Sequence, residues 1–292
     1  MGAPVAIDLS ELHVHLEGTV RRETALELAR LHGEPAPPAY AYADLAGFFA
    51  MYFPVAGLMR TAADFERVIV EHAAAMAGQR VAYAEVSFNP ALHPGTDWLA
   101  GVERGRDRAR AELGVEIAWL VELVRGAGTN EDAVEVALST PSVVGLGLVG
   151  DENISSDALV PLLERARAHG LRLMPHAGQT GGPEVVREAV EVLGAERIAH
   201  GVSALRDPAL CEMLARRETC LCVCPSSNRR IGLRPDYRAL ADAGIALSVN
   251  TDDPAMVGTT LPAELDIAEG LGLDRASLVA NAAHHRFGPV AT

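Results

Sequence analysis

Eight short apolar runs, each followed by a stretch with helical periodicity, restrict the fold of this chain more than any other feature. Short runs rich in Val, Ile and Leu are typical of strands buried on both faces, as in parallel sheets. Crossovers between parallel strands are right-handed, and eight such units close into a barrel. The predicted strands span residues 5–13, 81–87, 115–123, 143–148, 171–176, 197–200, 219–224 and 246–250.

Helices are predicted between these strands, at residues 97–113, 155–169, 183–193 and 208–217. Residues 34–38 are rich in proline and predict a loop, within a connection after strand one that is long enough for extra helices. No long linker divides the chain. We therefore expect an α/β fold, a (β/α)8 TIM barrel with extra helices after strand one, which spans residues 1–292 as a single domain.

Histidines and aspartates follow four of the predicted strands. His13 and His15 are one residue apart at the end of the first strand, so their side chains point the same way. His176 ends strand five, His200 ends strand six and Asp252 follows strand eight. Because active sites of such barrels lie at the carboxyl ends of the strands, these groups are expected to meet.

Three imidazoles and a carboxylate suit a zinc ion, and a bound water would then become acidic enough to react near neutral pH. His200 is the candidate acid/base for that water, and Asp253 is free to bind substrate. Taken singly, each histidine is more often a structural residue, and Asp-Asp-Pro is commonly a turn or helix cap. Together they predict a zinc hydrolase site. The other histidines, at positions 32, 72, 93, 169, 284 and 285, are expected to be structural or solvated.

Composition excludes several other classes of function. The formal net charge is −14 and no segment gathers basic residues, which argues against binding to nucleic acid. No apolar run is long enough to cross a bilayer, and the first residues lack the features of a signal peptide, so a cytoplasmic protein is expected. The four cysteines are expected to be reduced and buried. The oligomeric state stays open, a homo-oligomer included.

The motifs that carry these residues resemble those of the adenosine deaminase family of the amidohydrolase superfamily. The resemblance covers nearly the whole chain and is highly specific. It rests on Glu11-Leu-His-Val-His-Leu-Glu-Gly18, Val144-Gly-Leu-Gly-Leu-Val-Gly-Asp-Glu152, His176-Ala-Gly-Gln179, Arg197-Ile-Ala-His-Gly201, Cys224-Pro-Ser-Ser-Asn228 and Thr251-Asp-Asp-Pro-Ala-Met256.

The resemblance implies a role for each candidate residue and a small-molecule substrate. It implies one zinc ion on His13, His15, His176 and Asp252, with His200 orienting and deprotonating the attacking water. It also implies that Asp253 and the backbone of Gly150 bind ring nitrogens of a purine, that Ser227 supports the metal ligands, and that the aromatic segment at Phe48, Phe49 and Phe53 covers the substrate. Core packing explains that segment equally well.

Two positions depart from the family pattern. Position 179 is Gln where the family has the Glu that protonates a ring nitrogen, and an amide donates a hydrogen bond but transfers no proton. Position 17 is Glu where adenosine-specific members carry Asp, which resembles members that act on adenine or on modified nucleosides such as 6-aminodeoxyfutalosine. The carboxylate of such a nucleoside would suit Arg21 or Arg22.

These departures leave several functions open. The first is a zinc-dependent deaminase of an adenine-like nucleoside or aminated heterocycle, which releases ammonia and uses Glu17, Gly150, Gln179 and Asp253 for binding and His200, Asp252 and Gln179 for catalysis. The alternatives are a 6-aminodeoxyfutalosine-type deaminase, a zinc amidohydrolase acting on a non-purine ring, and a non-catalytic protein that keeps the ligand pocket.

Overall fold

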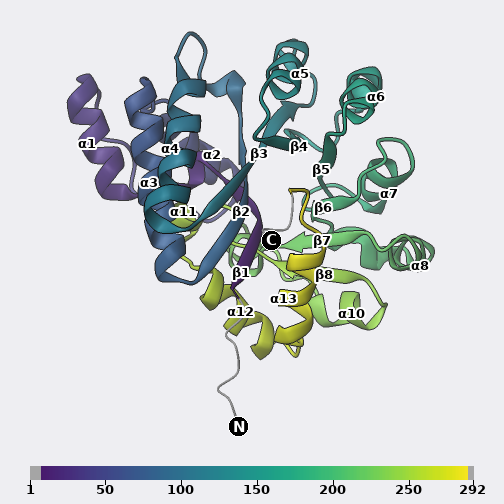
Figure 1. The fold of residues 1–292 in the computed structure, drawn as a ribbon. Coiled ribbons are helices and arrows are strands. Elements are labelled where there is room, and N and C mark those ends of the chain that lie inside the picture. The colour runs from purple at the N-terminus through teal and green to yellow at the C-terminus, as the bar shows by residue number, and fades with distance from the viewer. Residues whose placement is uncertain (1–7, 289–292) are drawn as a thin grey trace.

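Eight parallel strands form one sheet in the order β1 to β8, and helices surround it (Figure 1). The computed structural model describes residues 8–288. The sheet closes where Val14 of β1 bridges to Asp252, just after β8. The strands are β1 (Leu9–His15), β2 (Val81–Phe88), β3 (Glu116–Val124), β4 (Val143–Val149), β5 (Arg172–Ala177), β6 (Arg197–His200), β7 (Cys220–Val223) and β8 (Ala246–Val249). The predicted (β/α)8 barrel is confirmed.

The strands form because their side chains are buried on both faces. In β3, for example, Ile117, Trp119 and Val121 pack into the core around the barrel, and Ala118 and Leu120 pack inside it. The observed strands start and end within one or two residues of the predicted ones, except that β1 begins later and reaches His15. Residues 5–7 of the first predicted strand lie outside the described part of the chain.

Helices follow every strand, and three of them lie between β1 and β2. These are α1 (Arg22–His32), α2 (Leu45–Ala56) and α3 (Ala62–Gly78), and residues 34–38 form the expected loop between the first two. The others are α4 (Trp98–Leu113), α5 (Asn130–Ser139), α6 (Val160–Ala168), α7 (Pro183–Glu191), α8 (Pro208–Arg216), α9 (Pro225–Arg230), α10 (Tyr237–Asp242), α11 (Pro254–Val257), α12 (Leu261–Gly270) and α13 (Arg275–His284). Short 3₁₀ turns fall at Glu17–Thr19, Pro90–Leu92, Asp157–Leu159 and Val202–Arg206.

The amino-terminal end of the barrel is filled by an ion pair and by the segment after α13. Arg197 of β6 and Glu85 of β2 are fully buried, and their side chains meet across the barrel at 2.5 Å. Phe287 lies 3.6 Å below the Arg197 guanidinium, a cation–π arrangement, and Gly288 donates to Tyr83 at 3.0 Å. This end is therefore packed shut, which leaves the carboxyl ends of the strands as the open end.

The predictions made from the cysteines and from hydropathy can also be compared with the structure. Cys211, Cys220, Cys222 and Cys224 are all free and buried, as expected. Among residues 8–288, no helix combines the length and the apolar character that a membrane crossing requires.

Candidate active site

A cavity of about 620 Å³ opens at the carboxyl ends of the strands. Its inner wall carries His15, His176, His200 and Asp252, and its outer wall is built largely by α2. The other side chains and backbone groups that line it come mainly from the loops after β2, β3, β4, β5 and β7. They include Asn89, Leu92, Glu122, Val124, Val149, Gly150, Asp151, Glu152, Gln179, Thr180, Ser227, Ile231 and Asp253.

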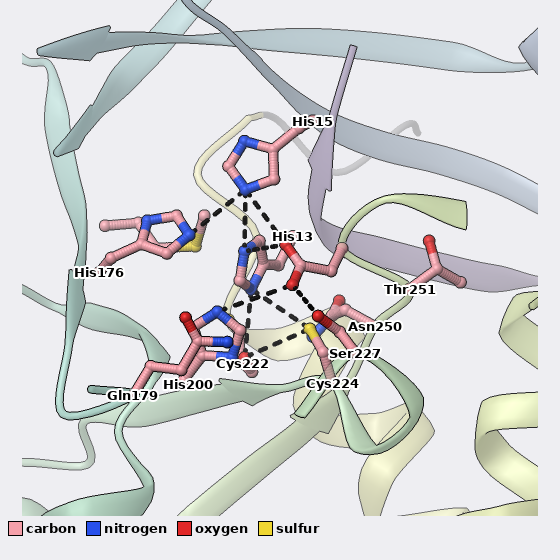
Figure 2. Close-up of polar contacts among 12 residues, drawn as sticks. His13, His15, His176, Gln179, His200, Cys222, Cys224, Ser227, Asn250 and Thr251 are labelled. Carbon is pink, nitrogen blue, oxygen red and sulfur yellow. Dashed lines mark hydrogen bonds and ion pairs between the residues drawn. The ribbon is translucent and has the colours of Figure 1, made fainter. Parts of the chain in front are cut away.

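Four candidate metal-binding side chains meet at the inner end of this cavity (Figure 2). The Nε2 atom of His15 lies 3.3 Å from Nε2 of His13 and 3.3 Å from Nε2 of His176. Oδ1 of Asp252 is 3.2 Å from Nε2 of both His13 and His15. All four donor atoms lie within 4.8 Å of one another; three of the residues are buried and His176 is partly buried.

These separations fit a shared metal ion. Two ligand atoms bound tetrahedrally to one zinc at about 2.05 Å lie roughly 3.3 Å apart. Hydrogen bonds explain the cluster less well, because Nε2 of His15 has three close neighbours and carries at most one proton. Nitrogen and oxygen donors also suit zinc better than calcium or magnesium.

A second layer of groups orients the four side chains. Nδ1 of His13 donates to the carbonyl oxygen of Cys222 at 3.2 Å, and Nδ1 of His15 donates to Oε1 of Glu122 at 2.5 Å. Both bonds place the ring proton on Nδ1 and leave the Nε2 lone pair free. The hydroxyl of Ser227 donates to Oδ2 of Asp252 at 2.6 Å. This is the supporting contact that the sequence motif predicts for Ser227.

Backbone geometry aims two of the groups into the cavity. His200 and Asp252 both adopt a φ of 65°, in the left-handed region that side chains other than Gly rarely occupy. Two backbone hydrogen bonds hold Asp252 in this conformation. Its N–H donates to the carbonyl oxygen of His13 at 3.1 Å, and its carbonyl oxygen accepts from the N–H of His15 at 2.8 Å. Such conformations cluster at functional sites because the surrounding structure enforces them.

Burial and neighbouring charges set the ionisation of the cluster. Burial lowers the pKa of His200 to about 3, so its ring is neutral near neutral pH. Burial and the nearby imidazoles likewise hold the pKa of His176 well below its usual value. For His15, burial acts in the same direction, but the charge of Glu122 and the bonds to Glu122 and Asp252 raise the pKa well above its usual value.

Asp253 and Gly150 both line the cavity. Oδ1 of Asp253 is buried and has no hydrogen-bond partner among the described residues. Burial and the charge of Asp252 raise the pKa of Asp253, which favours a protonated carboxyl able to donate a hydrogen bond. A Cβ at Gly18 would lie 2.0 Å from that Oδ1, so only glycine fits there. Gly150 has a φ of 101°, which also favours glycine.

Gln179 reaches the cavity as part of a chain of amides. Its Nε2 donates to Oδ1 of Asn228 at 3.0 Å, and Nδ2 of Asn228 bonds to the hydroxyl of Tyr237 at 2.8 Å. The nearby carboxylate of Glu152 is occupied, since it accepts hydrogen bonds from four successive backbone N–H groups, those of residues 178–181. Neither Gln179 nor Glu152 is therefore placed to supply a proton.

Glu17 lies behind the cavity wall and not in it. Its side chain is fully buried and accepts from the backbone of Asn89 at 3.2 Å and from His93 at 3.0 Å. Burial would raise the pKa of Glu17, but the bond to His93 outweighs it and lowers the pKa. The hydroxyl of Tyr52, which does line the cavity, lies 3.4 Å from Glu17. Glu17 is not among the residues that line the cavity, and the direct substrate contact expected from the sequence stays a prediction.

The suggested carboxylate partners, Arg21 and Arg22, also lie elsewhere. Arg21 pairs with Glu71 at 2.9 Å, and Arg22 donates to the backbone oxygen of Pro37 at 2.9 Å. Neither lines the cavity. Both are held at the start of α1 by these acidic and backbone partners, and a contact between either of them and a substrate carboxylate stays a prediction.

Sequence reasoning missed several residues that support the site. Glu122 lies two residues before the end of strand β3, so the rule that active sites form at the carboxyl ends of the strands could have pointed to it. Glu152 and Asn228 fall inside motifs that the resemblance rests on, but spacing alone gives them no role. Arg125, which donates to the carbonyl oxygen of His176 at 2.7 Å, has no sequence signal. His93, expected to lack a site partner, bonds to Glu17.

The comparisons with known proteins agree on one family. The family model described as "Adenosine deaminase" matches residues 9–285. An aminodeoxyfutalosine deaminase of Streptomyces coelicolor is 36% identical over 92% of this chain and 76% of its own length. An adenine deaminase of Rhodospirillum rubrum is 32% identical over 97% of this chain and 92% of its own length.

A solved structure has the same fold. The crystal structure of adenine deaminase from Arthrobacter aurescens superposes with a TM-score of 0.89 and 27% identity, covering 97% of this chain and 95% of that one. The likeness extends over the whole barrel, including the helices after β1 whose residues build the outer wall of the cavity.

Proposed function

The chain belongs to the adenosine deaminase family, and from this premise we propose that it is a metal-dependent hydrolase that replaces the amino group of an adenine-like substrate with oxygen and releases ammonia. The observation that carries the proposal is the meeting of His13, His15, His176 and Asp252 beside the neutral base His200, in a cavity sized for a small molecule. The names of the relatives support the reaction class.

One zinc ion is proposed to lie among the Nε2 atoms of His13, His15 and His176 and Oδ1 of Asp252. When bound, it would supply a Lewis acid that lowers the pKa of water towards neutrality. Glu122 and Ser227 keep the ligands in place.

His200 is the proposed proton carrier of the reaction. Its Nε2 lies 3.7 Å from Oδ2 of Asp252, on the side of the cluster that faces the cavity. As water adds to the amino-bearing carbon, His200 takes up one of its protons. That proton then passes to the leaving amino group, which departs as ammonia when the C–N bond breaks.

Substrate orientation is assigned to Asp253 and Gly150. The unpartnered carboxyl of Asp253 can donate to a bare ring nitrogen, and the backbone at Gly150 can contact another. These two contacts lie on opposite walls of the cavity's inner end, after β8 and β4. They would hold a flat heterocycle with its amino-bearing carbon towards the metal ligands.

The presence of Gln179 affects where the second proton of the reaction can go. Water provides two protons, one for the leaving group and one for the ring nitrogen next to the attacked carbon. A carboxylic acid at position 179 could transfer a proton to that ring nitrogen, whereas Gln179 can only form a hydrogen bond with it. Loss of general acid catalysis lowers the reaction rate by about 10²–10⁴-fold. This favours a substrate whose ring nitrogen is protonated when it binds.

A second candidate follows from the same observation. An amino-heterocycle more basic than a purine would arrive with the proton already on its ring, and Gln179 would then serve as a neutral hydrogen-bond partner. Hydrolysis of such a ring needs the same metal ligands and His200. The two candidates differ in substrate only, so one screen separates them.

The test is metal analysis followed by ammonia release over a panel of aminopurines, pterins and other amino-heterocycles. We expect about one equivalent of zinc per chain, and slow turnover of adenine that falls as pH rises and protonated substrate disappears. Gln179→Glu should raise kcat/KM on adenine by about 10²-fold or more. Gln179→Ala is the matched control and should not. Metal-free purified protein with no gain on zinc addition would contradict the proposal.

A further inference from the structure

His176 differs from the other two proposed histidine ligands in how its ring is held. Nδ1 of His13 bonds to the carbonyl oxygen of Cys222, and Nδ1 of His15 bonds to Glu122. The Nε2 atom of His176 faces His15 at 3.3 Å (Figure 2), but its Nδ1 is buried and has no hydrogen-bond partner among the described residues. No hydrogen bond at Nδ1 orients this ring, so its position depends on the backbone that carries it.

The backbone at His176 is held by Arg125, the first residue after β3. Nη2 of Arg125 donates to the carbonyl oxygen of His176 at 2.7 Å. In the sheet β4 lies between β3 and β5, so this contact spans the carboxyl end of β4. Gly150, just after β4, permits the close approach of the two loops, since a Cβ there would lie 3.3 Å from the backbone nitrogen of Arg125.

The guanidinium of Arg125 is buried with few partners. The residue is 4% exposed, and its Nε and Nη1 atoms have no hydrogen-bond partner within the described part of the chain. Burial lowers the pKa of Arg125, and the charges of Glu152 and Glu188 act against that effect. A buried cation with unused N–H groups costs stability, so stability alone does not account for Arg125.

Glu152 holds the residues that follow His176 by their N–H groups. Its carboxylate accepts from the backbone N–H groups of residues 178–181, at 2.5 to 3.2 Å. The segment 176–181 is therefore bonded to a cation through a carbonyl oxygen and to an anion through its N–H groups. Hydrogen bonds to charged groups are stronger than neutral ones. We refer to Arg125 and Glu152 as the charge clamp.

We propose that the charge clamp is a positioning device of the active site, in which Arg125 fixes the backbone of His176 for metal binding and Glu152 fixes the backbone of Gln179 beside the substrate. The inference rests on the proposed function, which supplies the roles of His176 and Gln179. Arg125 is not among the residues that line the cavity, so it acts through the backbone and not by touching the substrate.

Arg125→Met removes the cation and keeps a long apolar side chain. Zinc affinity, measured by competition with a chelator of known affinity, should fall about 10–100-fold, as for other groups that orient metal ligands. The visible spectrum of the cobalt-loaded variant should change, because it reports ligand geometry. The urea midpoint of the metal-free variant should be unchanged or higher, since the unsatisfied buried cation is gone. Arg125→Lys can donate to the same oxygen and should recover part of the zinc affinity.

Arg106→Met is the matched control. Nε of Arg106 also donates to the carbonyl oxygen of a β3 residue, that of Ile117 at 2.8 Å, but near the opposite end of the strand. This variant should lower the urea midpoint and leave the zinc affinity and the cobalt spectrum unchanged. An arginine with a purely structural role behaves in this way.

Nuclear magnetic resonance of the metal-free protein tests the clamp without metal or substrate. In Glu152→Gln, amide hydrogen exchange at residues 178–181 should be at least about tenfold faster than in the wild type, the worth of one hydrogen bond to a charged group. In Arg125→Met, the carbonyl ¹³C resonance of His176 should shift. Glu131→Gln, at an exposed residue of α5, is the control for both measurements.

Each outcome decides one question. Wild-type zinc affinity and cobalt spectrum in Arg125→Met overturn the clamp, whatever its urea midpoint. A wild type that binds no zinc and releases no ammonia contradicts the proposed function, and the resonance measurements then decide the clamp alone. Unchanged exchange in Glu152→Gln with an unchanged His176 resonance in Arg125→Met overturns it. If Arg125→Met does not fold, Arg125→Lys and Glu152→Gln undergo the same measurements, and wild-type values in both overturn the clamp.

Discussion

Glu122 never reaches the metal-facing side of the cluster, yet it fixes how His15 presents its lone pair. Its Oε1 accepts the Nδ1 proton of His15 at 2.5 Å, inside a cavity wall where water is largely excluded. Groups in this position hold the ring in one tautomer and raise the basicity of its other nitrogen. At the scale of single residues, the site therefore depends on side chains that bind neither metal nor substrate.

Glu122→Gln tests that dependence. The amide keeps the shape but loses the charge, so zinc affinity should fall about 10–100-fold, with little change in the far-ultraviolet circular dichroism. Competition with a chelator of known affinity measures it. Glu131→Gln, on the exposed side of α5, is the control. An unchanged affinity in Glu122→Gln would show that His15 needs no such partner.

Sequence reasoning at this scale succeeded where a residue ends a strand and failed where a contact is long-range. His13, His15, His176 and Asp252 could be found from strand ends alone, and the structure brings them together. That Glu17 turns away to His93, 76 residues later, has no local signal. The role of each gathered residue stays a proposal until it is measured.

Among the elements, α3 contains a titratable group that the site does not use. His72 lies on its partly buried face, and its buried Nε2 has no partner among the described residues. Burial lowers the pKa of His72 to about 4. The unfolded chain binds this proton near pH 6.5 and the folded chain only near pH 4. Stability is therefore lost as pH falls through that window.

His72→Gln should remove this contribution. The stability of the variant relative to the wild type should improve between pH 7 and pH 4.5, on the order of 2 kcal/mol. Urea unfolding at several pH values gives the comparison, and carboxylates elsewhere affect both proteins alike. His169→Gln serves as the control, since His169 is exposed. Curves for wild type and His72→Gln that stay parallel with pH would refute the burial argument.

Elements were predictable where their pattern is strong. Strand 197–200 was predicted with its observed ends, because β6 is a short buried run between a predicted helix and a glycine. The helices after β1 were expected only as extra helices, and their bounds depend on caps such as Asp44, which accepts from Gly47 at 2.7 Å. The orientation of α2, with an aromatic stripe towards the cavity, required the three-dimensional structure.

At the scale of the whole molecule, the buried ion pair at the closed end links β2 and β6 across the barrel. Arg197→Met leaves the buried Glu85 without its cationic partner, so the free energy of unfolding should fall by about 3–5 kcal/mol. The double variant Arg197→Met, Glu85→Gln should recover part of this loss in unfolding free energy, because no buried acid is then left without its cationic partner. Urea unfolding measures both. The exposed pair of Arg238 and Asp242, 2.7 Å apart, is the control, and Arg238→Met should cost less than about 1 kcal/mol.

The closure of the barrel has a consequence for synthesis of the protein. His13 and His15 are made before Asp252, which follows them by some 240 positions and meets them at the seam between β1 and the end of β8. A chain still on the ribosome can gather its histidines but lacks the carboxylate that completes the donor set. On the proposed assignment, tight binding of metal requires that β8 has joined β1, so bound metal would report closure of the barrel.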